Sequence, residues 1–122
     1  MTTDYLPACC TALSAHWPLP HQLPSLQLCS TRFDPTLLHS GDFQRCAITP
    51  VTGVAKRQAE YLAGRLCARS ALNQLTGLAT VPGSGADRAP QWPAGTLGSI
   101  THGSGWAGAV VGNSSDWRGL GL

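Results

Sequence analysis

The side chains best suited to chemistry in this chain are basic and hydroxyl groups in two separate stretches. One stretch, 54–75, carries three arginines, and the other, 97–102, reads Leu-Gly-Ser-Ile-Thr-His. Guanidinium groups match the geometry of phosphate oxygens, and Ser or Thr hydroxyls add neutral donors. If they converge, these groups would bind a polyphosphate. The candidates are Arg57, Arg65, Arg69, Arg88, Ser99, Thr101 and His102.

A structural interpretation of the same residues stays open beside the functional one. Arginines on a helix are most often solvated, with their alkyl stems laid along apolar surface. A histidine at a strand end is most often a hydrogen-bonded structural residue. Arg57 and Arg65 are about two helical turns apart, so they share a helix face and can act on one ligand.

Composition excludes several classes of function. The formal net charge is only +2, too small a field to favour nucleic acid. Charged residues make up 11% of the chain, against about 25% in typical soluble domains, which suggests a missing partner or a missing part of the chain. No apolar run reaches the roughly 20 residues of a membrane span.

The cysteines point to a reducing compartment. There are five, an odd count, with no CxxC pair and no signal peptide. A disulfide framework is therefore not expected, and the expected compartment is the cytoplasm. The four histidines lack metal-site spacing to the cysteines. Cys67 lies among apolar residues and is predicted to be a buried thiol.

One long helix and a few strands are predicted to position the candidates. Residues 54–75 contain no proline and many strong helix formers, and Gly77 follows where a helix stop is expected. Gly64 in mid-helix suggests close approach by another element or a ligand. Strands are expected at 26–33, 97–102 and 106–111, the last two joined as a hairpin by Gly103-Ser104-Gly105.

The remaining segments are predicted to be irregular, with one exception. Residues 1–25 contain four prolines and form an extended approach segment; 35–53 is loop or short helix; 79–96 is loop. Residues 118–122 are expected to begin a third strand after the hairpin. The fold class is therefore α+β, a long helix packed on a small antiparallel sheet.

Three motifs in order resemble those of the 4′-phosphopantetheinyl transferases, in the subgroup similar to enterobactin synthase component D. The first is Lys56-Arg57-Gln58-Ala59-Glu60-Tyr61-Leu62-Ala63-Gly64-Arg65-Leu66-Cys67-Ala68-Arg69. The second is Asp87-Arg88-Ala89-Pro90-Gln91-Trp92-Pro93-Ala94-Gly95, and the third is Gly98-Ser99-Ile100-Thr101-His102. The resemblance runs from about Trp17 to Leu122.

The resemblance implies a substrate and a set of contacts. The family transfers the phosphopantetheine arm of coenzyme A to a serine of a carrier protein. By resemblance, Arg57 and Arg65 contact coenzyme A phosphates, and Arg88 belongs to the loop that covers the nucleotide. Thr101 and His102 match the strand-end pair that binds the nucleotide phosphates, and Ser99 belongs to the same motif. The implied partner is an acyl or peptidyl carrier protein of siderophore or fatty-acid pathways.

The resemblance also implies that the chain is one half of a two-subdomain transferase with pseudo-twofold symmetry. In the family, the strand that begins like Gly119–Leu122 continues into an Asp-x-Glu pair that holds magnesium. These ligands would follow Leu122, so no catalytic or metal residue is expected within the chain. Residues 1–25 would form the extended segment and 26–122 the N-terminal subdomain. The missing C-terminal half is then a partner, and the fragment alone is expected to be inactive.

Two alternatives remain at this stage. The chain could be a non-catalytic half-domain that binds coenzyme A or self-associates, or an unstable truncation product with no function of its own.

Overall fold

The long helix α2, Ala55–Thr76, is the element around which the rest of the chain is organised. The computed structural model describes residues 5–15, 23, 25–84 and 89–119. Every residue from Leu62 to Arg69 is buried, so the middle of α2 is covered on all sides. The expected helix at 54–75 is therefore confirmed to within a residue at each end.

Two glycines fix how α2 ends and how closely it packs. Gly77 follows the helix in the left-handed conformation, φ 80°, and its N–H donates to the carbonyl of Asn73, as expected for a helix stop. Gly64 faces strand β4 (Thr96–Gly103), and a Cβ placed there would lie 2.7 Å from Cγ2 of Ile100. The close approach predicted at Gly64 is therefore confirmed, and the approaching element is the sheet.

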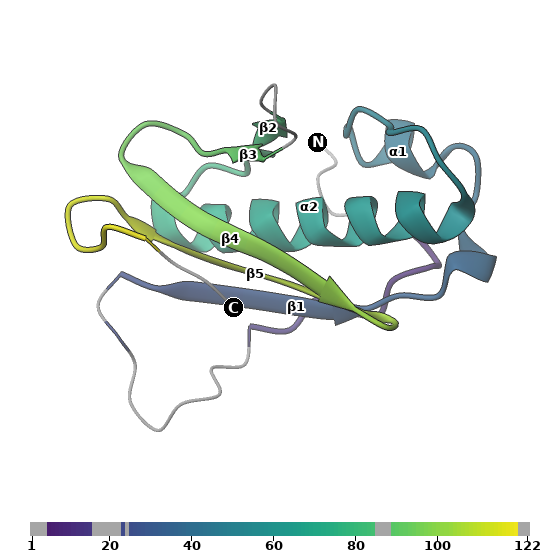
Figure 1. Ribbon diagram of the computed structural model, residues 1–122, viewed down its shortest axis with the longest axis horizontal. Coiled ribbons are helices and arrows are strands. Elements are labelled where there is room, and N and C mark those ends of the chain that lie inside the picture. The colour runs from purple at the N-terminus through teal and green to yellow at the C-terminus, as the bar shows by residue number, and fades with distance from the viewer. Residues whose placement is uncertain (1–4, 16–22, 24, 85–88, 120–122) are drawn as a thin grey trace.

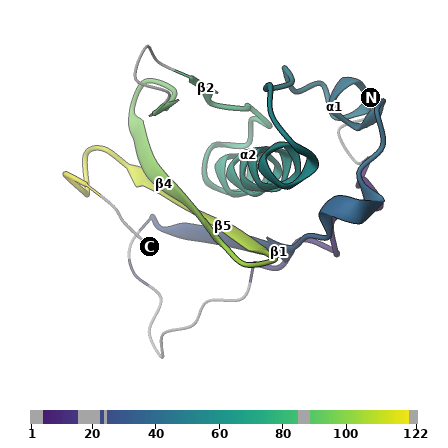
Figure 2. The same ribbon diagram turned by 45° about the vertical axis from the view of Figure 1, so that its right-hand side comes forward.

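Three antiparallel strands form the sheet beneath the helix, in the order β1-β5-β4. They are β1 (Gln27–Arg32), β4 (Thr96–Gly103) and β5 (Trp106–Asn113), and β4 and β5 form the expected hairpin. Figures 1 and 2 show α2 lying on one face of this sheet, as an α+β layer pair. The predicted fold class is confirmed.

The register of the sheet decides which side chains face the helix. Ala107, Ala109 and Val111 of β5 are buried in the two core clusters that include α2 residues. Side chains directly opposite each other in an antiparallel pair share a face. Ile100 lies opposite Ala109, and His102 lies opposite Ala107, so both of these β4 residues are on the helix side.

The helix side away from the sheet is covered by short elements and loops (Figure 2). These are the 3-10 helix η1 (Pro35–Leu37), α1 (Asp42–Arg45) and the two-residue strands β2 (Gly83–Ser84) and β3 (Pro90–Gln91). Residues 35–53, expected to be loop or short helix, contain both, with η1 and α1 separated and followed by loop. The prediction of plain loop over 79–96 is wrong, because residues 83–84 and 90–91 pair as a small hairpin.

The described N-terminal segment is part of the core. Residues 5–15 contain no helix, and they run beside β1 through isolated bridges from Cys10 to Phe33 and from Ser14 to Ser30. Cys9 and Cys10 are buried in the same cluster as α2 residues. The rest of the predicted extended segment lies largely outside the described residues.

The predicted third strand at 118–122 is not supported where it can be assessed. Arg118 and Gly119 are not in a strand, and residues 120–122 lie outside the described part of the chain. A turn at 114–116 precedes them, and the carbonyl of Asn113 accepts hydrogen bonds from the N–H groups of Asp116 and Trp117. Helices in the described ranges are too short or too polar to span a membrane.

Candidate functional site

A cavity of about 470 Å³ lies where α2, the end of β4 and the small β2–β3 hairpin meet. It brings together three of the predicted site residues, Arg57, Arg65 and His102. Two come from one face of α2, as their spacing predicted, and the third comes from the helix side of the sheet. The full lining is Val51, Thr52, Arg57, Glu60, Tyr61, Arg65, Ser84, Pro90, Ile100 and His102.

Arg65 is the buried cation of this cavity, with only 4% of its surface exposed. Its Nη2 donates to Oγ of Ser84 at 3.1 Å, and its Cζ lies 4.5 Å from the centre of the Tyr61 ring. Its Nε is buried with no hydrogen-bond partner, and no carboxylate of the described residues forms an ion pair with it. A buried, unpaired donor on a charged group is costly, so an anionic ligand would stabilise it.

Arg57 lies at the exposed edge of the cavity, two turns earlier on α2. Its Nε donates to the carbonyl of Thr52 at 3.1 Å, which fixes the side chain against the loop before the helix. The two terminal nitrogens remain for a ligand in the cavity. Arg57 is thus a solvated cation at the entrance, whereas Arg65 is a desolvated one at the base.

His102 completes the cationic set from the end of β4. Its side chain is 49% exposed, and Nδ1 lies 3.4 Å from Oε2 of Glu60. Glu60 is the only acidic residue among the described residues that line the cavity. Contact with Glu60 orients the imidazole so that Nε2 is the ring nitrogen left for a ligand.

Ser99 and Thr101 are not brought to the cavity with the other predicted residues. In the register of the sheet they lie opposite Val110 and Gly108, one position out of phase with Ile100 and His102. Successive side chains of a strand point to opposite faces. Both hydroxyls are therefore on the sheet face away from α2. Of the two remaining candidates, Arg69 does not line this cavity but lines another one, and Arg88 lies outside the described residues.

Sequence analysis did not identify the three side chains that contact the predicted cations, namely Glu60, Tyr61 and Ser84. A hydroxyl contact of 3.2 Å joins Tyr61 Oη to Ser84 Oγ, which also accepts from Arg65. The spacing of Tyr61 and Arg65, four residues apart on a helix, was a usable signal for their contact. Ser84 had none, because a two-residue strand leaves no periodic pattern.

The cavity does not by itself fit magnesium. That ion requires oxygen ligands, with one or two carboxylates beside phosphate oxygens. Here the one carboxylate is Glu60, and it is paired with His102. Within the described ranges, no group of three or more His, Cys, Asp or Glu side chains is arranged to hold a metal ion.

The fold and the cavity together define an α+β domain. Its cationic cleft lies between the long helix and the end of strand β4. Comparison with known proteins places that domain in a family. Residues 51–112 match the family model described as the 4′-phosphopantetheinyl transferase N-terminal domain. The chain belongs to the 4′-phosphopantetheinyl transferase family.

Individual relatives agree with the family model. The chain is 40% identical over 105 residues to enterobactin synthase component D of Salmonella typhimurium, covering 81% of this chain and 42% of that protein. It is 46% identical over 70 residues to the 4′-phosphopantetheinyl transferase PptT of Mycobacterium tuberculosis, covering 57% of this chain and 30% of that protein. The match to the transferase Npt of Nocardia iowensis is 38% identical over 69 residues, covering 57% of this chain and 31% of that protein. The chain thus spans less than half the length of these relatives.

Proposed function

We propose that the cavity binds the phosphate groups of coenzyme A, and that the chain acts as the N-terminal half of a 4′-phosphopantetheinyl transferase. Arg57, Arg65 and His102 are the proposed contacts. The observation that carries the proposal is Arg65, a buried guanidinium with an unpartnered Nε and no carboxylate partner, facing a cavity in a chain of this family. Arginine forks bind phosphate oxygens in this manner.

The proposed reaction transfers phosphopantetheine from coenzyme A to a serine of an acyl or peptidyl carrier protein. The serine oxygen forms a bond to the phosphorus that carries pantetheine, and the pyrophosphate bond to 3′,5′-ADP breaks. The three cations would hold the phosphates in place and offset the charge that develops on the departing ADP. Positioning and electrostatic stabilisation account for most catalysis of phosphoryl transfer. Siderophore and fatty-acid pathways are the proposed settings, with the cytoplasm as the compartment.

The proposal assigns the magnesium carboxylates to a C-terminal half, since the cavity residues do not fit that ion. The isolated chain is then expected to bind coenzyme A without transferring its arm. Incubation with an apo carrier protein, coenzyme A and magnesium should leave the carrier protein unmodified by mass spectrometry. Efficient modification by the purified chain would refute the assignment of the metal ligands to a second half.

The direct test is calorimetric titration of the chain with coenzyme A, with and without magnesium. We expect saturable binding that weakens by roughly tenfold or more in His102→Ala, because a hydrogen bond to a charged group contributes about 1.5–3 kcal/mol. His39→Ala is the matched control, since His39 is exposed and does not line the cavity. Unsaturable binding, or equal affinity in the two variants, would contradict the proposed site.

A further inference from the structure

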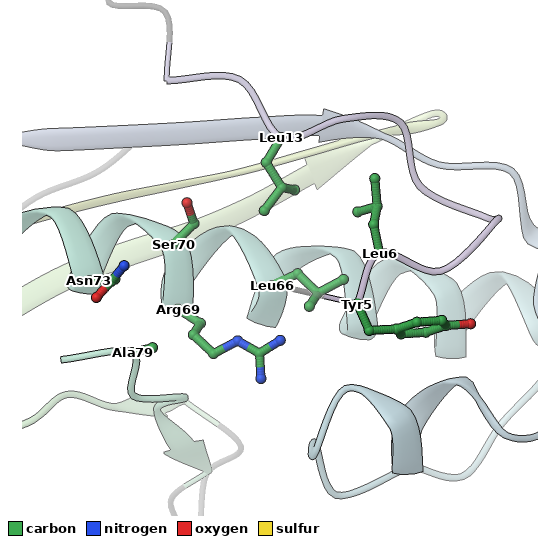
Figure 3. Close-up of a pocket in the computed structure, with 8 residues that line it drawn as sticks. All are labelled: Tyr5, Leu6, Leu13, Leu66, Arg69, Ser70, Asn73 and Ala79. Atoms are coloured by element: carbon green, nitrogen blue, oxygen red, sulfur yellow. The ribbon is translucent and has the colours of Figure 1, made fainter. Parts of the chain in front are cut away.

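A second cavity, of about 250 Å³, lies along a different stretch of the α2 surface from the proposed coenzyme A site. Helix residues advance by about 100° each, so Leu66, Ser70 and Asn73 face roughly away from Arg57 and Tyr61, whereas Arg69 lies only about 40° around the helix from Arg65 and one turn further along. The N-terminal segment and the chain after α2 close the space (Figure 3). Its lining is Tyr5, Leu6, Leu13, Leu66, Arg69, Ser70, Asn73 and Ala79.

Arg69 is the charged group of this cavity, and it is only 7% exposed. Its Nη1 donates to the carbonyl of Cys46, a neutral acceptor. No carboxylate of the described residues forms an ion pair with it. The one fully buried acid among them, Asp42, accepts instead from Tyr5 Oη and from the backbone N–H of His39, both at 2.9 Å. A buried cation held only by a neutral carbonyl is poorly compensated.

The walls of the cavity differ in chemistry. Arg69, Ser70 and Asn73 contribute hydrogen-bonding groups from α2, and Figure 3 shows the Arg69 side chain leaving the helix on the side where Ala79 lies, with its guanidinium directed toward α1. The apolar side is formed by Leu6, Leu13 and Leu66. Among the described residues, no acidic side chain lines it. A ligand complementary to these walls has one negative end and a short apolar body.

We propose that this second cavity binds a small aliphatic carboxylate, with its carboxylate on Arg69 and its alkyl chain against the three leucines. A guanidinium fork accepts a carboxylate in planar, bidentate geometry. The volume is below that of typical drug-sized sites, so a ligand of a few carbons is appropriate. A phosphate dianion fits less well, because one arginine and an apolar wall would not replace its hydration.

The site is separate from the proposed coenzyme A cavity. The two cavities have no lining residue in common. The affinity for a carboxylate should therefore be the same in the presence and absence of coenzyme A. The result of the binding experiment does not depend on the proposed transferase role.

The test is NMR titration of the whole chain with acetate, butyrate and inorganic phosphate at constant ionic strength. We expect butyrate to saturate, with shifts of the amides near Ala79 and 66–73, and to bind about tenfold tighter than acetate, from burial of two further methylenes. Equal, unsaturable effects of the three anions would overturn the proposal. So would phosphate binding as tightly as butyrate.

Two variants with matched controls locate the binding. Ala79→Leu should fill the cavity and abolish butyrate binding, while Ala94→Leu, at an exposed alanine outside it, should not. Asn73→Ala should weaken binding severalfold, and the neighbouring Gln74→Ala should leave it unchanged. All four positions are exposed, so the variants are expected to fold. Butyrate affinity that is unaffected by Ala79→Leu would refute the assigned location.

Discussion

At the scale of single residues, the most consequential feature is the pair of buried arginines one turn apart on α2. Arg65 and Arg69 lie in the middle of the most buried stretch of the helix, and neither forms an ion pair with a described carboxylate. Buried guanidinium groups are normally paired, because desolvation of the charge is costly. Each arginine lines a different cavity, and each cavity is proposed above to bind an anion at its arginine.

Substitution of the two arginines of the proposed coenzyme A site should have unequal effects. Lysine keeps the positive charge but loses the planar fork, and at position 65 it also loses the geometry of contact with Ser84 and Tyr61. We expect Arg65→Lys to weaken coenzyme A binding by about tenfold or more and Arg57→Lys by clearly less, since Arg57 is exposed. Calorimetric titration measures both, with circular dichroism to verify folding. A larger loss of coenzyme A affinity in Arg57→Lys than in Arg65→Lys would contradict the expected order of the two effects.

At the scale of elements, the long and periodic parts of the fold could be predicted from the sequence. The helix and the β4–β5 hairpin depend on strong local preferences and on a glycine-rich turn, both of which are local signals. The hairpin of β2 and β3 could not be predicted, because two-residue strands are held by contacts with α2 and show no alternation. Tyr61 and Arg65 contact Ser84 of this hairpin.

The candidate site was predicted only in part for a similar reason. Arg57 and Arg65 share a helix face by spacing alone, and His102 joins them because the strand end is beside the helix. Successive side chains of β4 point to opposite faces, so Ser99 and Thr101 lie on the other face of the sheet from His102. A sequence motif does not show on which face each of its residues lies. The buried state of Arg65 also depends on tertiary packing, so it was not visible from composition.

Close contact between α2 and β4 gives a prediction for the packing of these elements. Gly64→Ala should improve helix propensity by up to about 1 kcal/mol, yet its Cβ would lie 2.7 Å from a methyl of Ile100. That methyl is attached to a stiff, branched Cβ, so relief requires movement of the helix or the strand. We expect a net loss of about 1–2 kcal/mol in the free energy of unfolding in urea.

A double-mutant cycle separates this overlap from other effects. Ile100→Ala removes the contacting methyl, so Gly64→Ala should cost less in that background, with a coupling of about 1 kcal/mol or more. Additive effects of the two substitutions would show that the overlap is not the cause of the loss.

At the scale of the whole molecule, the five cysteines are all free and all buried, so the folded state protects its thiols. Burial raises the pKa of Cys46 to about 11, against the weaker opposing influence of Arg69. A hydrogen bond with a neighbouring thiol, Cys9 or Cys29, and then burial also raise the pKa values of Cys10 and Cys67. A thiol with a raised folded-state pKa keeps its proton in the native protein after the unfolded chain has lost it.

The sign of the pH dependence follows from this difference. Stability from the protonated thiol is fully present below the unfolded pKa near 9 and is lost as pH rises towards about 11. We expect the free energy of unfolding to fall between pH 9 and 11, and to fall less steeply in Cys46→Ala. Urea denaturation at a series of pH values measures both slopes. Equal slopes in the two proteins would exclude Cys46 as a contributor.

The two edges of the sheet are not equivalent. Beside β1, residues 11 and 14 already exchange backbone hydrogen bonds with Arg32 and Ser30, whereas among the described residues no strand pairs with the outer edge of β4. Among the described residues, the outer edge of β4 is therefore open to pairing with a further strand. Because Ile100 and His102 of β4 line the cationic cavity, a strand added there would run along the rim of that cavity. Whatever extends the sheet would thereby determine the access of a ligand to Arg65.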